Sequence, residues 1–128
     1  MRVYLAGPIN GCSDAECKDW RTAAKAGLAG LAECLDPMDR DYRGRELENV
    51  ASIVENDKAD IDSCDVVLVY FIKPSVGTAM EVLYAWQRMK TVIVVNVSGK
   101  PPSPWLTYHS QAVFADVSQA IAAIKLVA

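Results

Sequence analysis

Hydrophobic residues along this chain fall into two kinds of pattern that alternate from one end to the other. Short, nearly continuous runs rich in β-branched residues are typical of buried strands, and apolar residues that recur every three or four positions are typical of helices. The short runs predict strands at 3–6, 34–36, 66–71, 91–97 and 112–115. The helical spacing predicts helices at 14–33, 46–61, 78–89 and 117–126.

The alternation of strands and helices predicts a parallel sheet with helices on both faces. The expected fold class is α/β: a single Rossmann-like (flavodoxin-like) domain over residues 1–128, with a parallel sheet of about five strands. In such sheets ligands bind beyond the carboxyl ends of the strands, near the point where the strand order reverses. This rule selects the loops after the first, third and fourth predicted strands, at 7–14, 73–77 and 96–104.

Composition agrees with one globular domain, since the 128 residues are 52% hydrophobic and 23% charged. No apolar run approaches the roughly 18–20 residues of a membrane-spanning helix, and the first residues do not resemble a signal peptide. We therefore expect a cytoplasmic protein with no membrane partner. Four cysteines without a C-x-x-C pair, and a single histidine, give no support for a metal site, so no metal or cofactor is expected.

The charge balance narrows the choice of ligand. There are 13 basic and 16 acidic residues, a net charge of −3, and no basic stripe. We therefore expect no polymeric nucleic acid as a partner, because binders of such polymers usually carry a basic surplus. A small anion is compatible with this balance, since a few backbone N–H groups can hold it.

The most informative segment for chemistry leaves a buried strand and enters a helix. Ser75 and Gly77 lie where backbone N–H groups point outward, and Glu81 follows about one turn into the helix. We expect the carboxylate of Glu81 to lie under the same pocket. The structural alternative is that Ser75 only caps the helix and Glu81 only complements its dipole.

Two further segments carry candidate residues. Asp57 belongs to an acidic run at 55–65 just before a buried strand, and such runs are usually solvated helix ends. The first strand runs from Tyr4 into Gly7 and Pro8, which allow the chain to turn tightly and expose its backbone. The glycine spacing here matches neither a dinucleotide-binding fingerprint nor a P-loop.

Together these residues resemble the nucleoside 2-deoxyribosyltransferase superfamily, which includes base-exchanging transferases and 2'-deoxynucleoside 5'-monophosphate N-hydrolases. The resemblance spans residues 1 to about 97 and rests on three motifs in the right order: Tyr4-Leu5-Ala6-Gly7-Pro8, Asp57, and Ser75-x-Gly77-x-x-x-Glu81. It implies that Glu81 is the nucleophile that attacks the anomeric carbon, that Asp57 helps to protonate the departing base, and that Tyr4 orients the nucleophile. The substrate-binding positions it implies, at the sugar and its 5' end, are Gly7, Pro8, Ile9, Asn10, Ser75 and Gly77.

The residue types fit this chemistry. Cleavage of a glycosidic bond through an oxocarbenium-like state needs two carboxyl groups with different tasks. One must be ionised, and the other must supply a proton directly or through water. A helix N-terminus would favour an ionised Glu81, and a partly buried position would favour a proton on Asp57.

Ser75 favours the hydrolase branch. The base-exchange transferases commonly carry an aspartate six positions before the nucleophile, which suits a free 5'-hydroxyl and repels a phosphate. Asn10 departs from the pattern of the hydrolases, which carry a phosphate-binding arginine at this position. Lys18 or Arg21, from the following helix, could substitute for that arginine. Hydrolysis of a (deoxy)nucleoside 5'-monophosphate is thus the preferred function. Base exchange on deoxyribose is the first alternative, and a non-catalytic nucleotide-binding domain is the second.

The resemblance also implies a homodimer or a higher homo-oligomer whose sites are shared across the interface. In the hydrolases a serine of the neighbouring subunit reaches the phosphate, and Ser110 is the candidate by position. Large residues such as Trp86, Met89, Trp105 and Tyr108 lie in segments that could join such an interface. Contacts to the base are expected from the loops at 10–17 and 38–45.

Overall fold

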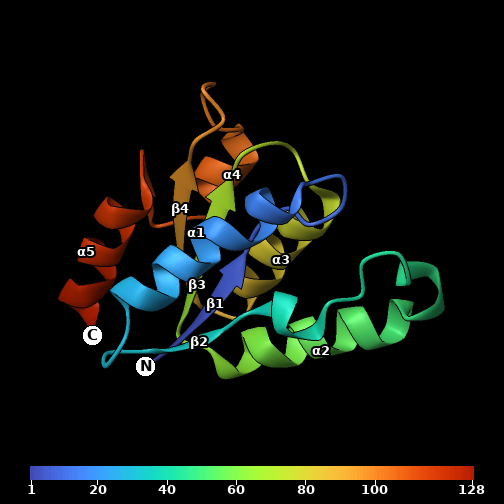
Figure 1. The fold of residues 1–128 in the computed structure, drawn as a ribbon. Coiled ribbons are helices and arrows are strands. Elements are labelled where there is room, and N and C mark those ends of the chain that lie inside the picture. Colours follow the sequence, from blue (N-terminus) through green and yellow to red (C-terminus); the bar gives the residue numbers. More distant parts are fainter.

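A five-stranded sheet forms the centre of the computed structural model, which describes residues 1–128 (Figure 1). All strands are parallel, in the order β2-β1-β3-β4-β5. The strands are β1 (Arg2–Ala6), β2 (Glu33–Leu35), β3 (Val66–Phe71), β4 (Thr91–Asn96) and β5 (Ala112–Phe114). The predicted fold class, an α/β domain with a five-stranded parallel sheet, is confirmed.

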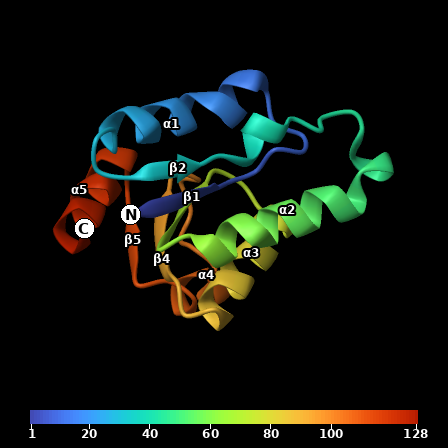
Figure 2. The same ribbon diagram turned by 90° about the horizontal axis from the view of Figure 1, so that it is seen from below.

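Helices cover both faces of the sheet. They are α1 (Asp14–Gly27), α2 (Val50–Ser63), α3 (Val76–Gln87), α4 (Pro104–Tyr108) and α5 (Val117–Val127), with short 3₁₀ turns at Pro37–Arg40 and Glu46–Glu48. α1 and α5 contribute apolar side chains to one buried cluster, and α2, α3 and α4 contribute to the other. Figure 2 shows α1 on one side of the sheet and α2, α3 and α4 on the other. No helix has the length and apolar character needed to cross a membrane.

The alternation of side chains along β1 decides which residues reach which face. Val3 and Leu5 point into the cluster under α1 and α5, whereas Tyr4 and Ala6 point toward α2 and α3. All four side chains are fully buried. Tyr4 is therefore a polar side chain placed in the layer between the sheet and the helix that carries Glu81.

The strand order reverses at β1, which lies between β2 and β3. The carboxyl ends of β1 and β3 are neighbours, since Ala6 pairs with Val69. This is the place where ligands bind in open α/β sheets. The loops after β1 and β3 meet here, as the sequence predicts.

Several predicted boundaries are wrong, each for a local reason. α1 ends at Gly27 instead of residue 33, because Leu28 caps it and Gly30 turns the chain with a φ of 78°. α2 begins at Val50 instead of residue 46, because Glu46–Glu48 forms a separate 3₁₀ turn and the backbone of Asn49 is not helical.

Two other differences concern the second half of the chain. α3 begins at Val76, two residues before the predicted start, because Ser75 caps the helix with its side chain. α4 is absent from the prediction, since five residues are too few to show a helical period. Ser103 and Pro104 nevertheless begin it in the usual way, with a side-chain cap followed by proline.

Candidate active site

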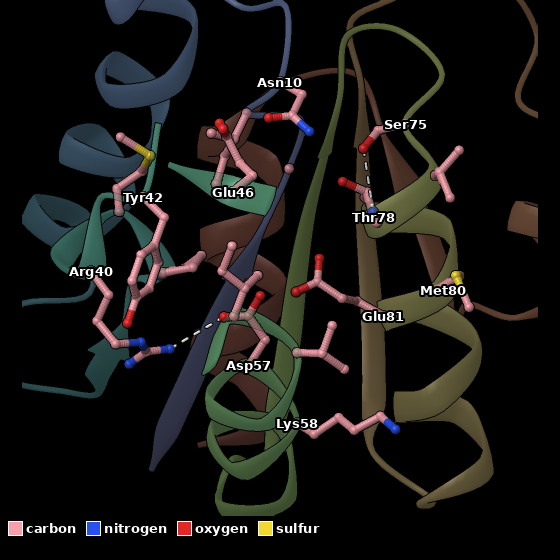
Figure 3. Close-up of a pocket in the computed structure, with 18 of the residues that line it drawn as sticks. Asn10, Arg40, Tyr42, Glu46, Asp57, Lys58, Ser75, Thr78, Met80 and Glu81 are labelled. Atoms are coloured by element: carbon pink, nitrogen blue, oxygen red, sulfur yellow. Dashed lines mark hydrogen bonds and ion pairs between the residues drawn. The ribbon is translucent and has the colours of Figure 1, made fainter. Parts of the chain in front are cut away.

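A cavity of about 640 Å³ opens beyond the carboxyl ends of β1 and β3 (Figure 3). Its walls come from the loop after β1, the segment between β2 and α2, the inner face of α2 and the first turns of α3. The polar side chains that line it include Asn10, Arg40, Tyr42, Asp57, Ser75, Thr78 and Glu81. The loop at 96–104 contributes no lining residue, so its predicted part in the pocket is wrong.

Glu81 lies at the floor of this cavity, and Tyr4 lies directly beneath it. The phenol of Tyr4 donates a short hydrogen bond to Oε2 of Glu81. Burial and the nearby carboxylates raise the pKa of Tyr4 above its ordinary value, so the phenol keeps its proton and acts as a donor. This bond fixes one carboxylate oxygen and leaves Oε1 available to a ligand.

The pKa of Glu81 differs from the expectation. Burial raises its pKa to about 8, the hydrogen bond from Tyr4 acts against this rise, and the negative charge of Asp57 adds to it. A helix N-terminus was expected to keep Glu81 ionised. Glu81 lies in the second turn of α3, however, where the effect of the helix dipole has fallen away, and burial dominates.

Asp57 is held by an ion pair. Nη2 of Arg40 lies 3.2 Å from Oδ1 of Asp57 and 2.7 Å from Oδ2 of Asp60. Burial raises the pKa of Asp57, and Arg40 acts in the opposite direction. The raised pKa agrees with a proton donor at Asp57, a role that stays a prediction.

The first turn of α3 forms the opposite end of the cavity. Oγ of Ser75 accepts the N–H of Thr78 at 3.3 Å and so caps the helix. An added Cβ at Gly77 would have no heavy atom within 4 Å, so the backbone is open to close approach. Oγ1 of Thr78 is buried without a hydrogen-bond partner. Together with the helix N-terminus, these groups can bind an anion.

The end of β1 is supported from below by Arg21. Its guanidinium donates to the carbonyl oxygens of Gly7 at 3.2 Å and Leu5 at 3.4 Å, and Nε lies 3.3 Å from Oδ1 of Asp36. Its side chain is only 1% exposed, so it cannot reach a ligand. Lys18 pairs with Asp14 at 3.2 Å and does not line the cavity. Neither residue can therefore take the place of the phosphate-binding arginine that the hydrolases carry at the position of Asn10.

Most of the predicted site residues meet at this cavity. Gly7, Ile9, Asn10, Asp57, Ser75, Gly77 and Glu81 line it, and Tyr4 touches Glu81 from beneath. Pro8 is buried and does not line the cavity. Ser110 follows α4, where its hydroxyl donates to the carbonyl of Thr107 at 3.2 Å, and it is not part of the cavity of its own chain.

From the sequence, no single residue of the segment between β2 and α2 was predicted to belong to the site. Arg40, Tyr42 and Arg43 line the cavity from this segment, which was expected only as a whole to contact a base. The ion pair from Arg40 to Asp57 is the missed feature. The available signal was a charged run that begins just after Pro37, beyond the end of a strand next to β1.

Comparisons with known proteins support the assignment of the fold and the family. The family model described as nucleoside 2-deoxyribosyltransferase matches residues 3–121. The chain is similar to the structure of a 2-deoxyribosyltransferase from Bacillus psychrosaccharolyticus, with a TM-score of 0.78, 20% identity, and coverage of 94% of this chain and 90% of that one.

Two other solved structures are similar over nearly their whole length. One is a 2-deoxyribosyltransferase from Leishmania mexicana, with a TM-score of 0.73, 20% identity, and coverage of 96% and 95%. The other is a CMP N-glycosidase from Clostridium botulinum, with a TM-score of 0.65, 16% identity, and coverage of 98% and 99%. At these identities the structures show a shared fold. No curated protein sequence matches the chain.

Proposed function

The chain belongs to the nucleoside 2-deoxyribosyltransferase family, and on this basis we propose that it hydrolyses the N-glycosidic bond of a (deoxy)nucleoside 5'-monophosphate. The products are the free base and the sugar phosphate. One observation carries the proposal: Glu81 lies on the cavity floor, oriented by Tyr4, with Asp57 and the N-terminus of α3 facing the same space.

Catalysis proceeds in two displacements. In the first, Oε1 of the ionised form of Glu81, which a pKa of about 8 makes the minor form at neutral pH, attacks the anomeric carbon while the bond from this carbon to the base nitrogen breaks. The electron pair goes to the base, which takes a proton from Asp57 directly or through water. In the second, water attacks the same carbon, releases the sugar phosphate and regenerates the carboxylate of Glu81, while Asp57 regains its proton. Paired carboxylates supply all of this chemistry, so the reaction requires neither a metal nor an organic cofactor.

The 5'-phosphate is assigned to the first turn of α3. Ser75, the backbone of Gly77 and the unpaired hydroxyl of Thr78 are neutral donors at a helix N-terminus, and no acidic side chain stands among them. Asn10 adds an amide at the same end of the cavity (Figure 3). An aspartate in place of Ser75 would repel a phosphate.

Base exchange on deoxyribose is the second candidate. It is favoured by the structural similarity to two 2-deoxyribosyltransferases and by the absence of an arginine at position 10. Transferase and hydrolase share the sugar–enzyme intermediate and differ in the acceptor, which is a second base or water.

Product analysis separates the candidates. The protein is incubated with a deoxynucleoside or its 5'-monophosphate, each with and without an acceptor base. Release of sugar phosphate from the monophosphate alone supports hydrolysis. Exchange from the unphosphorylated nucleoside with little hydrolysis indicates the transferase. Tight nucleotide binding without base release, unaffected by Glu81→Ala, indicates a non-catalytic binding domain.

We further propose a homodimer in which the partner covers the open side of the cavity. Met80 lines the cavity and is 68% exposed, so the cavity mouth is continuous with the outer face of α3. Exposed apolar side chains extend over this face and α4: Val76, Leu83, Trp105 and Tyr108. Such a cluster on a surface is typical of an interface.

In the assembled dimer, Ser110 of one subunit is expected to reach the phosphate bound by the other. Light scattering of the purified protein tests the assembly, and Ser110→Ala tests the contact through a raised KM for the monophosphate. A fully active monomer would contradict this part of the proposal.

A further inference from the structure

Arg40 occupies a place that the proposed mechanism does not use. It lies on the 3₁₀ turn after β2 and reaches across to α2, where both of its ion pairs use the same nitrogen, Nη2. Nε and Nη1 make no hydrogen bond within the chain. Because a guanidinium carries five N–H donors and no acceptor, Arg40 presents spare donors at the wall of the cavity.

The surroundings of Arg40 suit a flat heterocycle. The ring of Tyr42 lies beside Arg40 in Figure 3, and apolar side chains of the neighbouring segment and α2, among them Met38, Ile53 and Val54, also line the cavity. In Figure 3 Asp57 lies between Arg40 and Glu81. With the 5'-phosphate at the first turn of α3, as proposed, a sugar held at Glu81 has its base on the side of Asp57 and Arg40.

The other charged side chains of the cavity also have partners within the chain. Asp41 and Arg43 form a close ion pair with each other, at 2.7 Å. Oε1 of Glu46 accepts the N–H of Gly44 at 3.0 Å. Nζ of Lys58 lies over the ring of Tyr84. Arg40 differs from them because it is the cation that pairs with Asp57, and its Nε and Nη1 are left for a ligand.

We propose that Arg40 makes this site selective for bases that carry an oxo group, rather than an amino group, at C6 of a purine or C4 of a pyrimidine. The inference rests on the proposed function and names its substrate class. The oxo group accepts hydrogen bonds from Nε or Nη1 of Arg40. An amino group at the same place would set donor against donor and leave both without a partner, which is costly in a desolvated site.

The same contact assists departure of the base. As the bond between the anomeric carbon and the base nitrogen breaks, its electron pair is delocalised over the ring and reaches the oxo oxygen. Arg40 stabilises this developing charge, while Asp57 delivers a proton to the base, directly or through water. The positive charge of Arg40 remains unchanged throughout, so the atoms and charges of the proposed hydrolysis balance as before.

Paired substrates test the selectivity. For dIMP against dAMP, and for dUMP against dCMP, we expect kcat/KM of the wild-type protein to favour the oxo base by about tenfold or more. Arg40→Gln should lower kcat/KM for the oxo substrates by about tenfold or more and for the amino substrates by less than about threefold. Arg40→Lys keeps the charge near Asp57 but lacks the planar fork, and should also lose the preference.

The matched control is Arg2→Gln. It removes an arginine at the start of β1, at the end of the strand away from the cavity, and should leave the substrate ratios unchanged. Thermal denaturation of each variant reports whether it folds.

A binding measurement separates this inference from the proposed function. Titration of the Glu81→Gln variant with dIMP and dAMP reports base preference without turnover. Preferred binding of dIMP with no base release from any monophosphate by the wild-type protein would contradict the proposed function and leave the role of Arg40 standing. Equal binding of dIMP and dAMP, a preference for the amino base, or a substrate ratio unaffected by Arg40→Gln would overturn the role of Arg40.

Discussion

Tyr4 and Glu81 are separated by 77 positions in the chain and are joined by a hydrogen bond from the phenol to Oε2. Their meeting follows from the topology, because β1 pairs with β3 and α3 packs back over the face of the sheet to which Tyr4 points. The bond orients the carboxylate in a place where burial holds its pKa at about 8.

The raised pKa of Glu81 predicts a specific dependence of stability on pH. Between its ordinary pKa of 4.5 and about 8, the folded protein holds a proton that the unfolded chain has lost. The free energy of unfolding should therefore fall as pH rises through this window. Glu81→Gln removes the titration, so its Tm should exceed that of the wild-type protein by about 3 °C or more at pH 8 and match it near pH 4.5.

Thermal denaturation of both proteins between pH 4.5 and 8.5 measures this difference. Glu55→Gln, a change at an exposed position of α2, is the control and should parallel the wild-type curve. Parallel curves for wild type and Glu81→Gln would show that burial does not perturb this carboxyl group.

Asp57→Asn should lower kcat by about 10²–10⁴-fold, since the amide cannot supply a proton to the departing base. The loss should shrink when the base leaves without protonation, as 7-methylguanine does from its 2'-deoxynucleotide. Steady-state kinetics on dGMP and 7-methyl-dGMP measure the two effects. An equal loss on both substrates would assign Asp57 to positioning instead of proton transfer.

The Gly77→Ala variant should weaken phosphate binding without destabilising the fold. The added methyl group meets no heavy atom within 4 Å, and alanine is a better helix former than glycine, so the Tm should be unchanged or higher. The methyl group would nevertheless stand where the phosphate approaches the backbone. KM for a 5'-monophosphate should rise about tenfold, whereas KM for the unphosphorylated nucleoside should not change. Equal effects on both substrates would place the phosphate elsewhere.

Arg21 should matter for stability. Its guanidinium pairs with the buried Asp36, and Arg21→Met would leave Asp36 with only the partly exposed Lys25 as an ion-pair partner, at 2.7 Å. Breaking a buried pair typically costs about 3–5 kcal/mol of the free energy of unfolding. The double variant Arg21→Met/Asp36→Asn should recover part of this loss. Urea denaturation of the single and double variants measures the coupling, and strict additivity would contradict it.

The fold was largely predictable because its signals are local. The continuous apolar run of β3 gave its bounds without error, since a strand buried on both faces leaves a strong signal in the sequence. The end of α1 was missed because a cap at Leu28 and a turn at Gly30 interrupt a pattern that otherwise continues.

The site was predictable in its members and less so in its electrostatics. The ends of parallel strands selected Ser75, Glu81 and the loop after β1, and the family resemblance added Asp57 and the role of Glu81. The pairing of Arg40 with Asp57 depends on how the segment before α2 folds back, which no local pattern contains. The raised pKa of Glu81 arises from burial by distant parts of the chain and is likewise invisible in the sequence.

The central claim, that Glu81 forms a covalent bond to the sugar, is tested most directly by trapping the intermediate. A 2'-fluoro-arabino nucleoside 5'-monophosphate slows hydrolysis of a glycosyl ester, so the adduct should accumulate. Mass spectrometry of the intact protein should show one added fluoro-sugar phosphate, and peptide mapping should locate it on Glu81, with no adduct in Glu81→Gln. Release of the base without an adduct, or an adduct on another residue, would contradict the account.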